Sequence, residues 1–298
     1  MKPPPFAYHA PRSRDEALAI LAELGDDGKV LAGGQSLVPM LNMRLIAPRA
    51  LVDVSRLTEL DTIEVTEHHV RVGALTRQAR LHRDTEVARI QPLLRQALNW
   101  VAHPVIRNRG TVIGSLAHAD PAAELPAVLA LLDGQIELAS AGGQRTVAAH
   151  DYFLGPLESD TRPGELAVAA SFPVSPRSTG SAVVEFARRH GDYALAGVAV
   201  TVSLDEQRCA TRARATFLGV GGVPVVVDLS DLLAGQSAGT LEFGDAVARA
   251  RDAIEPDDDI HATAAYRRHL AGVLLARALS EAADRAAVAA QRSAEARA

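Results

Sequence analysis

The sequence predicts a fold of the α+β class in which helices and strands form more than one domain. The chain has 298 residues, of which 48% are hydrophobic and 22% charged, enough for two domains or for one domain with subdomains. Residues 1–56 suggest a strand, a glycine turn, a helix and a second strand in that order. From residue 176 on, strand-like runs precede a helical tail, an order typical of the α+β class.

The first segment, residues 1–56, reads as a small α/β unit. Ser13 and Glu16 form a capping box, and the leucines that follow at helical spacing predict a helix over residues 15–24. Residues 29–32 and 51–54 predict short strands, with a helix over 37–45 between them.

The second segment, residues 57–175, mixes strands with helices. It predicts a strand over 70–74 and helices over 90–101 and 124–132. A stretch rich in proline, serine and glycine then marks a boundary near residue 175. The third segment, 176–285, has strand-like runs at 182–186, 197–204 and 213–220 and a helical tail from about Ala262. The tail at 286–298 looks frayed or solvent-facing.

Composition excludes several classes of protein. The formal net charge of −5 argues against a nucleic-acid-binding protein, which usually presents a basic face. Cys209 is the single cysteine, so the chain holds no internal disulfide, iron–sulfur cluster or thiolate zinc site, and a reducing compartment is expected. The N-terminus lacks the apolar region of a secretory signal, and no apolar run is long enough for a membrane span. We therefore expect a cytoplasmic protein.

The strongest local feature is a strand that ends in two glycines, Gly33 and Gly34. A glycine pair lets backbone N–H groups approach a ligand closely, and concave runs of N–H groups bind phosphate oxygens. The pattern is neither a GxGxxG fingerprint nor a P-loop. A strand-to-helix turn without any ligand is the simpler interpretation of this feature alone.

The second feature is a run of small residues followed by acidic ones. Thr111 and Ser115 offer hydroxyls, and His118, Asp120 and Glu124 come soon after, which suits a ligand with phosphates at one end and hydroxyls at the other. A metal site would need further ligands, an acid–base pair would need a substrate pocket, and a plain polar loop before a buried helix explains the run equally well.

The third feature, residues 186–197, joins a basic run to a Gly-Asp turn and Tyr193. An exposed hairpin with a packing tyrosine is its simple interpretation. Nucleophilic hydrolysis has little support, because there is no Gly-x-Ser-x-Gly elbow and Cys209 has no suggestive neighbour. We expect no catalytic residue and no metal ligand in this chain.

Taken together, these stretches resemble the FAD-binding medium subunits of the molybdenum hydroxylases, the family of xanthine dehydrogenase, carbon monoxide dehydrogenase and quinoline oxidoreductase. The likeness covers nearly the whole chain and rests on the order and spacing of short segments, residues 5–8, 32–39, 106–111, 115–126, 187–194, 259–262 and 266–270. It implies an FAD-binding fold of the vanillyl-alcohol-oxidase type, with two α/β subdomains and a C-terminal α+β domain.

The resemblance also implies which residues hold FAD. The glycine turn and the loop at 111–115 would meet the pyrophosphate, Asp120 and Glu124 the ribityl chain, and Tyr193 the isoalloxazine. The full set of expected cofactor-binding residues is Val30, Leu31, Ala32, Gly33, Gly34, Gln35, Ser36, Leu37, Thr111, Val112, Ile113, Gly114, Ser115, His118, Asp120, Glu124, Leu166 and Tyr193.

By the same resemblance, the chain passes electrons and does not itself hydroxylate the substrate. A large partner subunit would carry a molybdenum–pterin cofactor, and a small partner two 2Fe-2S clusters. Electrons would reach FAD here and leave to an external acceptor, in a dimer of heterotrimers. A self-sufficient flavin oxidase, with His190 as its acid–base group, and a flavin-poor structural subunit are the alternatives.

One position departs from the family pattern. Ile113 stands where the family loop has a glycine. A β-branched residue strongly disfavours positive φ, so a glycine-like backbone there would cost on the order of 1–3 kcal/mol. This substitution predicts weaker FAD binding or a rearranged loop. If the turn needs positive φ, Ile113→Gly should tighten FAD binding.

Overall fold

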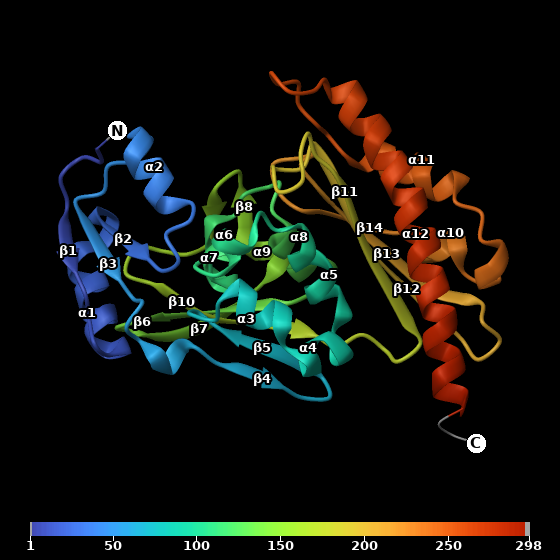
Figure 1. Ribbon diagram of the computed structural model, residues 1–298, viewed down its shortest axis with the longest axis horizontal. Helices are drawn as coiled ribbons and strands as arrows, with labels where there is room; N and C mark the ends of the chain where they lie inside the picture. The colour runs from blue at the N-terminus through green and yellow to red at the C-terminus, as the bar shows by residue number, and fades with distance from the viewer. Residues whose placement is uncertain (1, 296–298) are drawn as a thin grey trace. The chain divides into compact units, whose positions relative to one another are not determined.

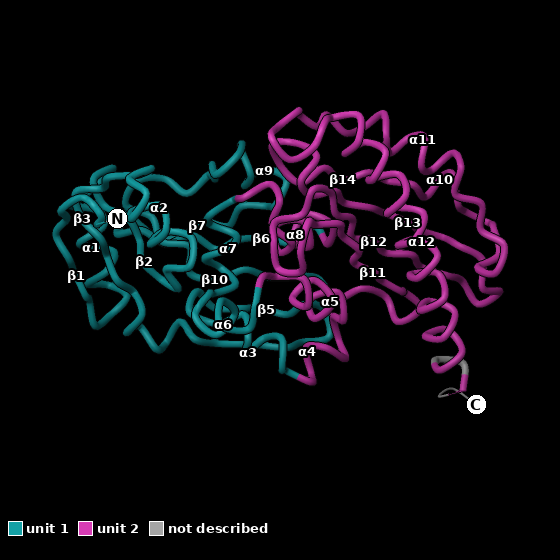
Figure 2. The backbone as a smooth tube through the Cα atoms, turned by 45° about the horizontal axis from the view of Figure 1, so that its top comes forward, with its two compact units in different colours: residues 1–84, 103–119, 133–173 teal, residues 85–102, 120–132, 174–298 magenta. Residues whose placement is uncertain are grey.

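The computed structural model describes residues 2–295 (Figure 1). The chain divides into two compact units, drawn in teal and magenta in Figure 2. Unit 1 comprises residues 1–84, 103–119 and 133–173, and unit 2 comprises residues 85–102, 120–132 and the chain from Val174 on. No helix among the described residues is long and apolar enough to cross a membrane.

The first part of unit 1 is a parallel sheet with strand order β1-β3-β2. Its strands are β1 (Ala7–His9), β2 (Gly28–Leu31) and β3 (Ala50–Asp53). Helix α1 (Arg14–Leu24) begins at Ser13, whose side chain accepts a hydrogen bond from the Glu16 N–H, and it contacts β3. A one-turn 3₁₀ helix, η1 (Gly25–Asp27), follows α1, and α2 (Leu37–Met43) follows β2. The predicted order of strand, glycine turn, helix and strand is confirmed.

The second part of unit 1 is an antiparallel sheet with strand order β4-β5-β10-β6-β7. A short hairpin, a one-turn 3₁₀ helix and four short helices accompany it. The bounds are β4 (Ile63–Val65), β5 (His69–Gly73), β6 (Gln135–Ser140), β7 (Gly143–Ala148), β8 (Phe153–Gly155), β9 (Glu158–Ser159), β10 (Leu166–Pro173), η2 (Thr58–Leu60), α3 (Gln78–Arg83), α6 (Pro104–Arg107), α7 (Val112–His118) and α9 (Ala149–Tyr152).

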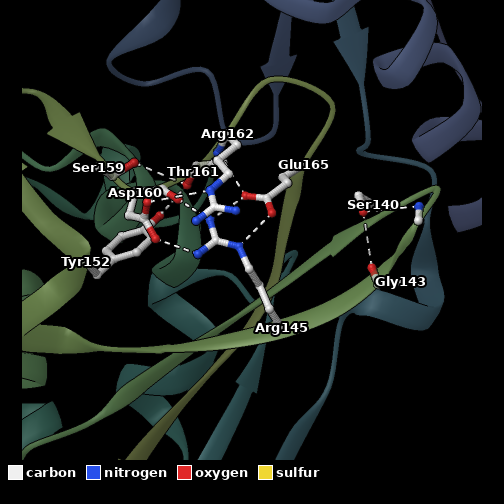
Figure 3. A network of polar contacts seen from close by, with 10 residues as sticks. Ser140, Gly143, Arg145, Tyr152, Ser159, Asp160, Thr161, Arg162 and Glu165 are labelled. Carbon is white, nitrogen blue, oxygen red and sulfur yellow. Dashed lines mark hydrogen bonds and ion pairs between the residues drawn. The ribbon is translucent and has the colours of Figure 1, made fainter.

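A polar network closes the edge of this second sheet (Figure 3). Arg145 on β7 donates through Nε and Nη2 to the two carboxylate oxygens of Glu165, both at 2.7 Å. It also donates from Nη1 to Asp160 Oδ2 at 2.5 Å and from Nη2 to the Asp160 carbonyl. The buried Tyr152 hydroxyl pairs with Thr161 Oγ1 at 2.8 Å. The network therefore fixes the segment that leads from β9 into β10.

Unit 2 is built on an antiparallel sheet with strand order β11-β12-β13-β14. Its elements are α4 (Thr85–Ile90), α5 (Pro92–Trp100), α8 (Glu124–Leu131), β11 (Thr179–Phe186), β12 (Ala196–Leu204), β13 (Ala210–Leu218), β14 (Val225–Asp228), α10 (Ser230–Leu233), η3 (Ala238–Thr240), α11 (Gly244–Ala253) and α12 (Ala264–Glu295). The last residues were expected to be frayed or solvent-facing. Helix α12 continues to Glu295, so as far as that residue they are not frayed, and Gln291, Arg292 and Glu295 are exposed to solvent.

The strands of unit 2 divide their side chains between two faces. Alternate residues such as Ala182, Val198 and Phe217 join the core formed with α10, α11 and α12. The opposite face meets α5 and α8: Ser181 donates to Gln96 Oε1 at 3.4 Å, and Leu218 packs with Ala127 of α8. The sheet is therefore covered on both faces, as its apolar strands predict.

Candidate functional site

The glycine turn lies at the carboxyl end of β2, in unit 1. Gly34 has φ of +71°, a conformation that favours glycine. The Val38 N–H donates to the Gly34 carbonyl at 3.0 Å, so helix α2 starts directly from the turn. Gln35 folds back, because its Nε2 donates to the Gly33 carbonyl at 2.9 Å. Ala32, Gly33, Gly34 and Ser36 are partly exposed, which leaves their main chain accessible.

The second predicted loop is the start of a helix. Thr111, 2% exposed, is the N-cap of α7, and its Oγ1 accepts a hydrogen bond from the Gly114 N–H at 3.0 Å. The main chain on either side is also fixed: the Val112 N–H donates to the Thr76 carbonyl at 3.1 Å, and the Gln78 N–H to the Gly110 carbonyl at 2.9 Å. Gly114 and Ser115 remain partly exposed.

These two segments lie against each other. A Cβ on Gly33 would stand 2.5 Å from the Arg109 carbonyl oxygen and 2.8 Å from Gly110 Cα, so only glycine permits this approach. Residues 30–37 and 111–115 contain no acidic side chain. Main chain, hydroxyls and small side chains gathered without negative charge fit a diphosphate group. The residues expected to hold the FAD pyrophosphate are therefore close together in unit 1.

The prediction of backbone strain at Ile113 is wrong. Ile113 lies in α7, is 2% exposed, and is not among the described non-glycine residues that have positive φ. Its side chain belongs to the core of unit 1, and its backbone is that of an ordinary helix. Ile113 therefore gives no reason to expect weakened cofactor binding.

The acidic residues and the tyrosine lie in unit 2. Asp120 Oδ1 accepts the Ala122 N–H at 2.9 Å, which forms a tight turn ahead of α8, and Glu124 is the first residue of that helix. Tyr193, 67% exposed, stands shortly before β12. Partial desolvation, followed by the charges of Asp120 and Glu124, raises the pKa of the Tyr193 hydroxyl. Unit 2 thus gathers these three side chains in one region.

Sequence reasoning missed a buried carboxyl group in the same unit. Glu185 on β11 is 8% exposed, and its Oε2 has no hydrogen-bond partner among the described residues. Burial, followed by the nearby Glu124 carboxylate, raises the pKa of Glu185 to about 8. The sequence offered no signal for this, because the strand pattern alone does not reveal which helix covers that face.

The remaining predicted residues occupy supporting positions. Val30 and Leu31 are the last residues of β2, and Leu37 is the first of α2. Leu166, 3% exposed, opens β10 and pairs with Ala139. His118 is the last residue of α7. Within residues 2–295, no group of three or more histidine, cysteine, aspartate and glutamate side chains is arranged to hold a metal ion.

Two family models match the chain. Residues 4–175 match the FAD binding domain in molybdopterin dehydrogenase, and residues 181–282 match the CO dehydrogenase flavoprotein C-terminal domain. The 6-hydroxypseudooxynicotine dehydrogenase complex subunit alpha of Paenarthrobacter nicotinovorans is 41% identical over 96% of this chain and 97% of that protein. The nicotine 6-hydroxylase medium subunit of the same organism is 36% identical over 96% and 100%.

Solved structures agree with these matches. One chain of the Cu,Mo-CO dehydrogenase crystal structure superposes with a TM-score of 0.90 at 35% identity, covering 96% of this chain and all (100%) of that one. A chain of quinoline 2-oxidoreductase from Pseudomonas putida 86 gives 0.89 at 36% identity, covering 96% and 99%. The chain therefore belongs to the FAD-binding medium subunits of the molybdenum hydroxylases.

Proposed function

We propose that this chain is the electron-transferring subunit of a heterotrimeric molybdenum hydroxylase. It takes electrons from 2Fe-2S clusters on a small partner subunit and delivers them to an external acceptor, while a large partner carrying molybdenum–pterin hydroxylates the substrate. The observation that carries the proposal is the backbone contact between Gly33 and Arg109, which brings two main-chain segments without acidic residues together.

In unit 1, the segments at 32–36 and 111–115 hold the pyrophosphate. The N–H groups of the glycine turn, together with the hydroxyls of Ser36 and Ser115, are donors for phosphate oxygens. The N–H groups of Val112, Gly114 and Ser115 already donate within the chain, to Thr76 and Thr111, and so fix the start of α7 before any ligand binds. Pre-ordered donors reduce the entropy that binding would otherwise cost.

In unit 2, Asp120 and Glu124 would accept hydrogen bonds from ribityl hydroxyls, and Tyr193 would contact the isoalloxazine. The exposed ring of Tyr193 offers an apolar surface to a flat ligand. Bound FAD supplies the redox chemistry, and the protein supplies its binding and electrostatic surroundings. We assign no general base to this chain.

The composition of the chain indicates which cofactors belong to partner subunits. Its single cysteine is too few for an iron–sulfur cluster, so the clusters belong to a partner. The printed names of its relatives, a dehydrogenase complex subunit and a medium subunit, describe parts of assemblies. We extend this to a dimer of heterotrimers in the cytoplasm, with a large molybdenum–pterin subunit and a small iron–sulfur subunit.

The test starts from the purified full chain. Titration with FAD should reach close to one flavin per chain, and affinity purification from the native host should recover a large and a small partner. The isolated chain should oxidise no organic substrate. A flavin content that stays far below stoichiometric after added FAD would favour a structural subunit, and substrate oxidation by the isolated chain would favour a self-sufficient oxidase.

A further inference from the structure

Arg267 is a buried arginine whose guanidinium is bound to main chain. It lies in the first turns of α12 and is 7% exposed. Nη1 donates to the Leu195 carbonyl at 2.6 Å and to the Gly219 carbonyl at 3.0 Å. Nη2 donates to Asp259 Oδ2 at 2.6 Å. Hydrogen bonds from a charged donor are stronger than neutral ones, so this guanidinium holds two carbonyls firmly.

Those two carbonyls belong to segments that adjoin the proposed flavin contacts. Leu195 comes two residues after Tyr193. The Gly219 N–H donates to the Pro121 carbonyl at 2.9 Å, and Pro121 follows Asp120. Gly219 has φ of +73°, and a Cβ there would stand 2.8 Å from the Ala194 carbonyl oxygen. Gly219 thus lies against both segments, and Arg267 donates to the carbonyls of Gly219 and Leu195.

The carboxylate of Asp259, which pairs with Arg267, is held by main-chain N–H groups. Asp259 Oδ1 accepts the His261 N–H at 2.7 Å and the Ala262 N–H at 2.8 Å. These backbone hydrogen bonds, together with Arg267, hold the pKa of Asp259 at about 2. Asp259 therefore stays ionised at neutral pH, and the buried guanidinium keeps a neutralising partner.

We propose that Arg267 is a positioning residue for the flavin end of the cofactor site, acting on Tyr193 through Leu195 and on Asp120 through Gly219 and Pro121. This inference rests on the proposed function, which assigns Asp120 and Tyr193 to FAD. Arg267 does not contact the cofactor; it sets the main chain that presents the contacting side chains.

The chain offers a matched control in the next residue. Arg268 also donates to two main-chain carbonyls, from Nε to Arg251 at 3.2 Å and from Nη2 to Ile254 at 3.2 Å. Both acceptors lie at the end of α11, away in the sequence from the Tyr193 and Asp120 segments. Arg268→Gln therefore removes a comparable anchor on α12 without touching those segments.

The experiment compares the full-length wild type with R267Q, R267K and R268Q. FAD affinity is measured by titration, the surroundings of the bound flavin by visible circular dichroism, and stability by Tm. R267Q should raise the Kd for FAD at least about tenfold and change the circular dichroism of the bound flavin. R267K should recover part of both, because lysine keeps the charge and can still donate to carbonyls. R268Q should lower Tm while leaving the Kd and the spectrum near wild type.

Unchanged Kd and spectrum in R267Q, measured well below its Tm, would overturn the inference. Equal changes in R267Q and R268Q would also overturn it, since they would report a general loss of stability. If R267Q does not fold, R267K and D259N replace it in the comparison. Both should raise the Kd for FAD and change the flavin spectrum in the same direction, but less. Failure of wild type to bind FAD, or an unaltered flavin spectrum in Tyr193→Ala, would instead refute the proposed function.

Discussion

Gly33 packs so closely on Arg109 that a Cβ at residue 33 would stand 2.5 Å from the Arg109 carbonyl oxygen. This contact joins the glycine turn to the segment that leads into α7. Backbone is the obstructing group, and backbone cannot rotate away as a flexible side chain can. The contact therefore sets the spacing between the two segments that we assign to the pyrophosphate.

Gly33→Ala should separate these segments. We expect a cost of about 1–3 kcal/mol in the free energy of unfolding, because overpacking displaces the backbone, and a clearly raised Kd for FAD. Urea unfolding and flavin titration measure the two effects. Gly239→Ala is the control, since a Cβ there meets nothing within 4 Å. Normal FAD affinity in Gly33→Ala would remove this contact from the site.

Ile113→Gly should destabilise the protein and should not tighten FAD binding, because Ile113 has no positive φ. The change removes a buried side chain from α7 and places glycine in a helix, so we expect a loss of about 3–5 kcal/mol in the free energy of unfolding. Ile113→Val is the milder comparison, at about 0.5–1.5 kcal/mol. Tighter FAD binding by Ile113→Gly would restore the original interpretation of a strained loop.

The mistake at Ile113 shows where sequence reasoning stopped. The predicted strain required positive φ at residue 113, whereas Thr111 is the N-cap of a helix that includes Ile113. The helices α6 and α7, of 4 and 7 residues, are too short for a clear hydrophobic period, so no helix was predicted between residues 101 and 124.

The longer helices and strands, and the protein family, could be predicted from the sequence. The helix over 15–24, the strands before and after the glycine turn, and the strands after residue 176 carry strong local patterns, and the predicted family and α+β fold are confirmed. Arg267 and Glu185 were not predictable. Arg267 contacts Leu195 across 72 positions in sequence, and the burial of Glu185 depends on the helices that pack against β11, among them α5.

The buried carboxyl of Glu185 should make stability depend on pH. Its pKa is raised from 4.5 to about 8 in the folded chain, so the folded state holds a proton that the unfolded state has lost between those values. Protonated Glu185 contributes to the free energy of unfolding. This contribution is fully present below about pH 4.5 and is lost as the pH rises through about 8. Between about pH 5.5 and about pH 8 the loss should be on the order of 3 kcal/mol.

Glu185→Gln tests this pH dependence, because glutamine resembles the protonated acid. Urea unfolding of both proteins across this range should give a flatter profile for the variant, and the two curves should diverge most at alkaline pH. Groups that do not interact with Glu185 titrate equally in the two proteins, so the difference reports Glu185 together with its coupling to Glu124. Parallel profiles would mean that Glu185 ionises in the folded protein at its ordinary pKa.

The Arg145 network should stabilise unit 1 more than an exposed ion pair does. The Glu165 side chain is 10% exposed and Arg145 26%, and the two make a bidentate pair. Arg145→Gln leaves Glu165 without its charged partner. We expect a cost of about 1–3 kcal/mol, below the value for a fully buried pair because water partly screens the arginine. Arg49→Gln, which breaks the pair with Asp27 at 82% and 52% exposure, should cost at most about 1 kcal/mol.

The stability measured at acidic pH distinguishes the contribution of the Arg145 charge from that of its packing. Although burial opposes ionisation, hydrogen bonds from Arg145 and the Arg162 N–H lower the pKa of Glu165 below its ordinary value. A lowered folded-state pKa contributes stability above about pH 4.5 that is lost as the pH falls. The wild type should therefore lose more stability than Arg145→Gln as the pH falls from about 5 to well below about 4.5. If both proteins lose the same stability on acidification, the Arg145 charge does not stabilise the ionised Glu165. Arg145 would then act through packing alone.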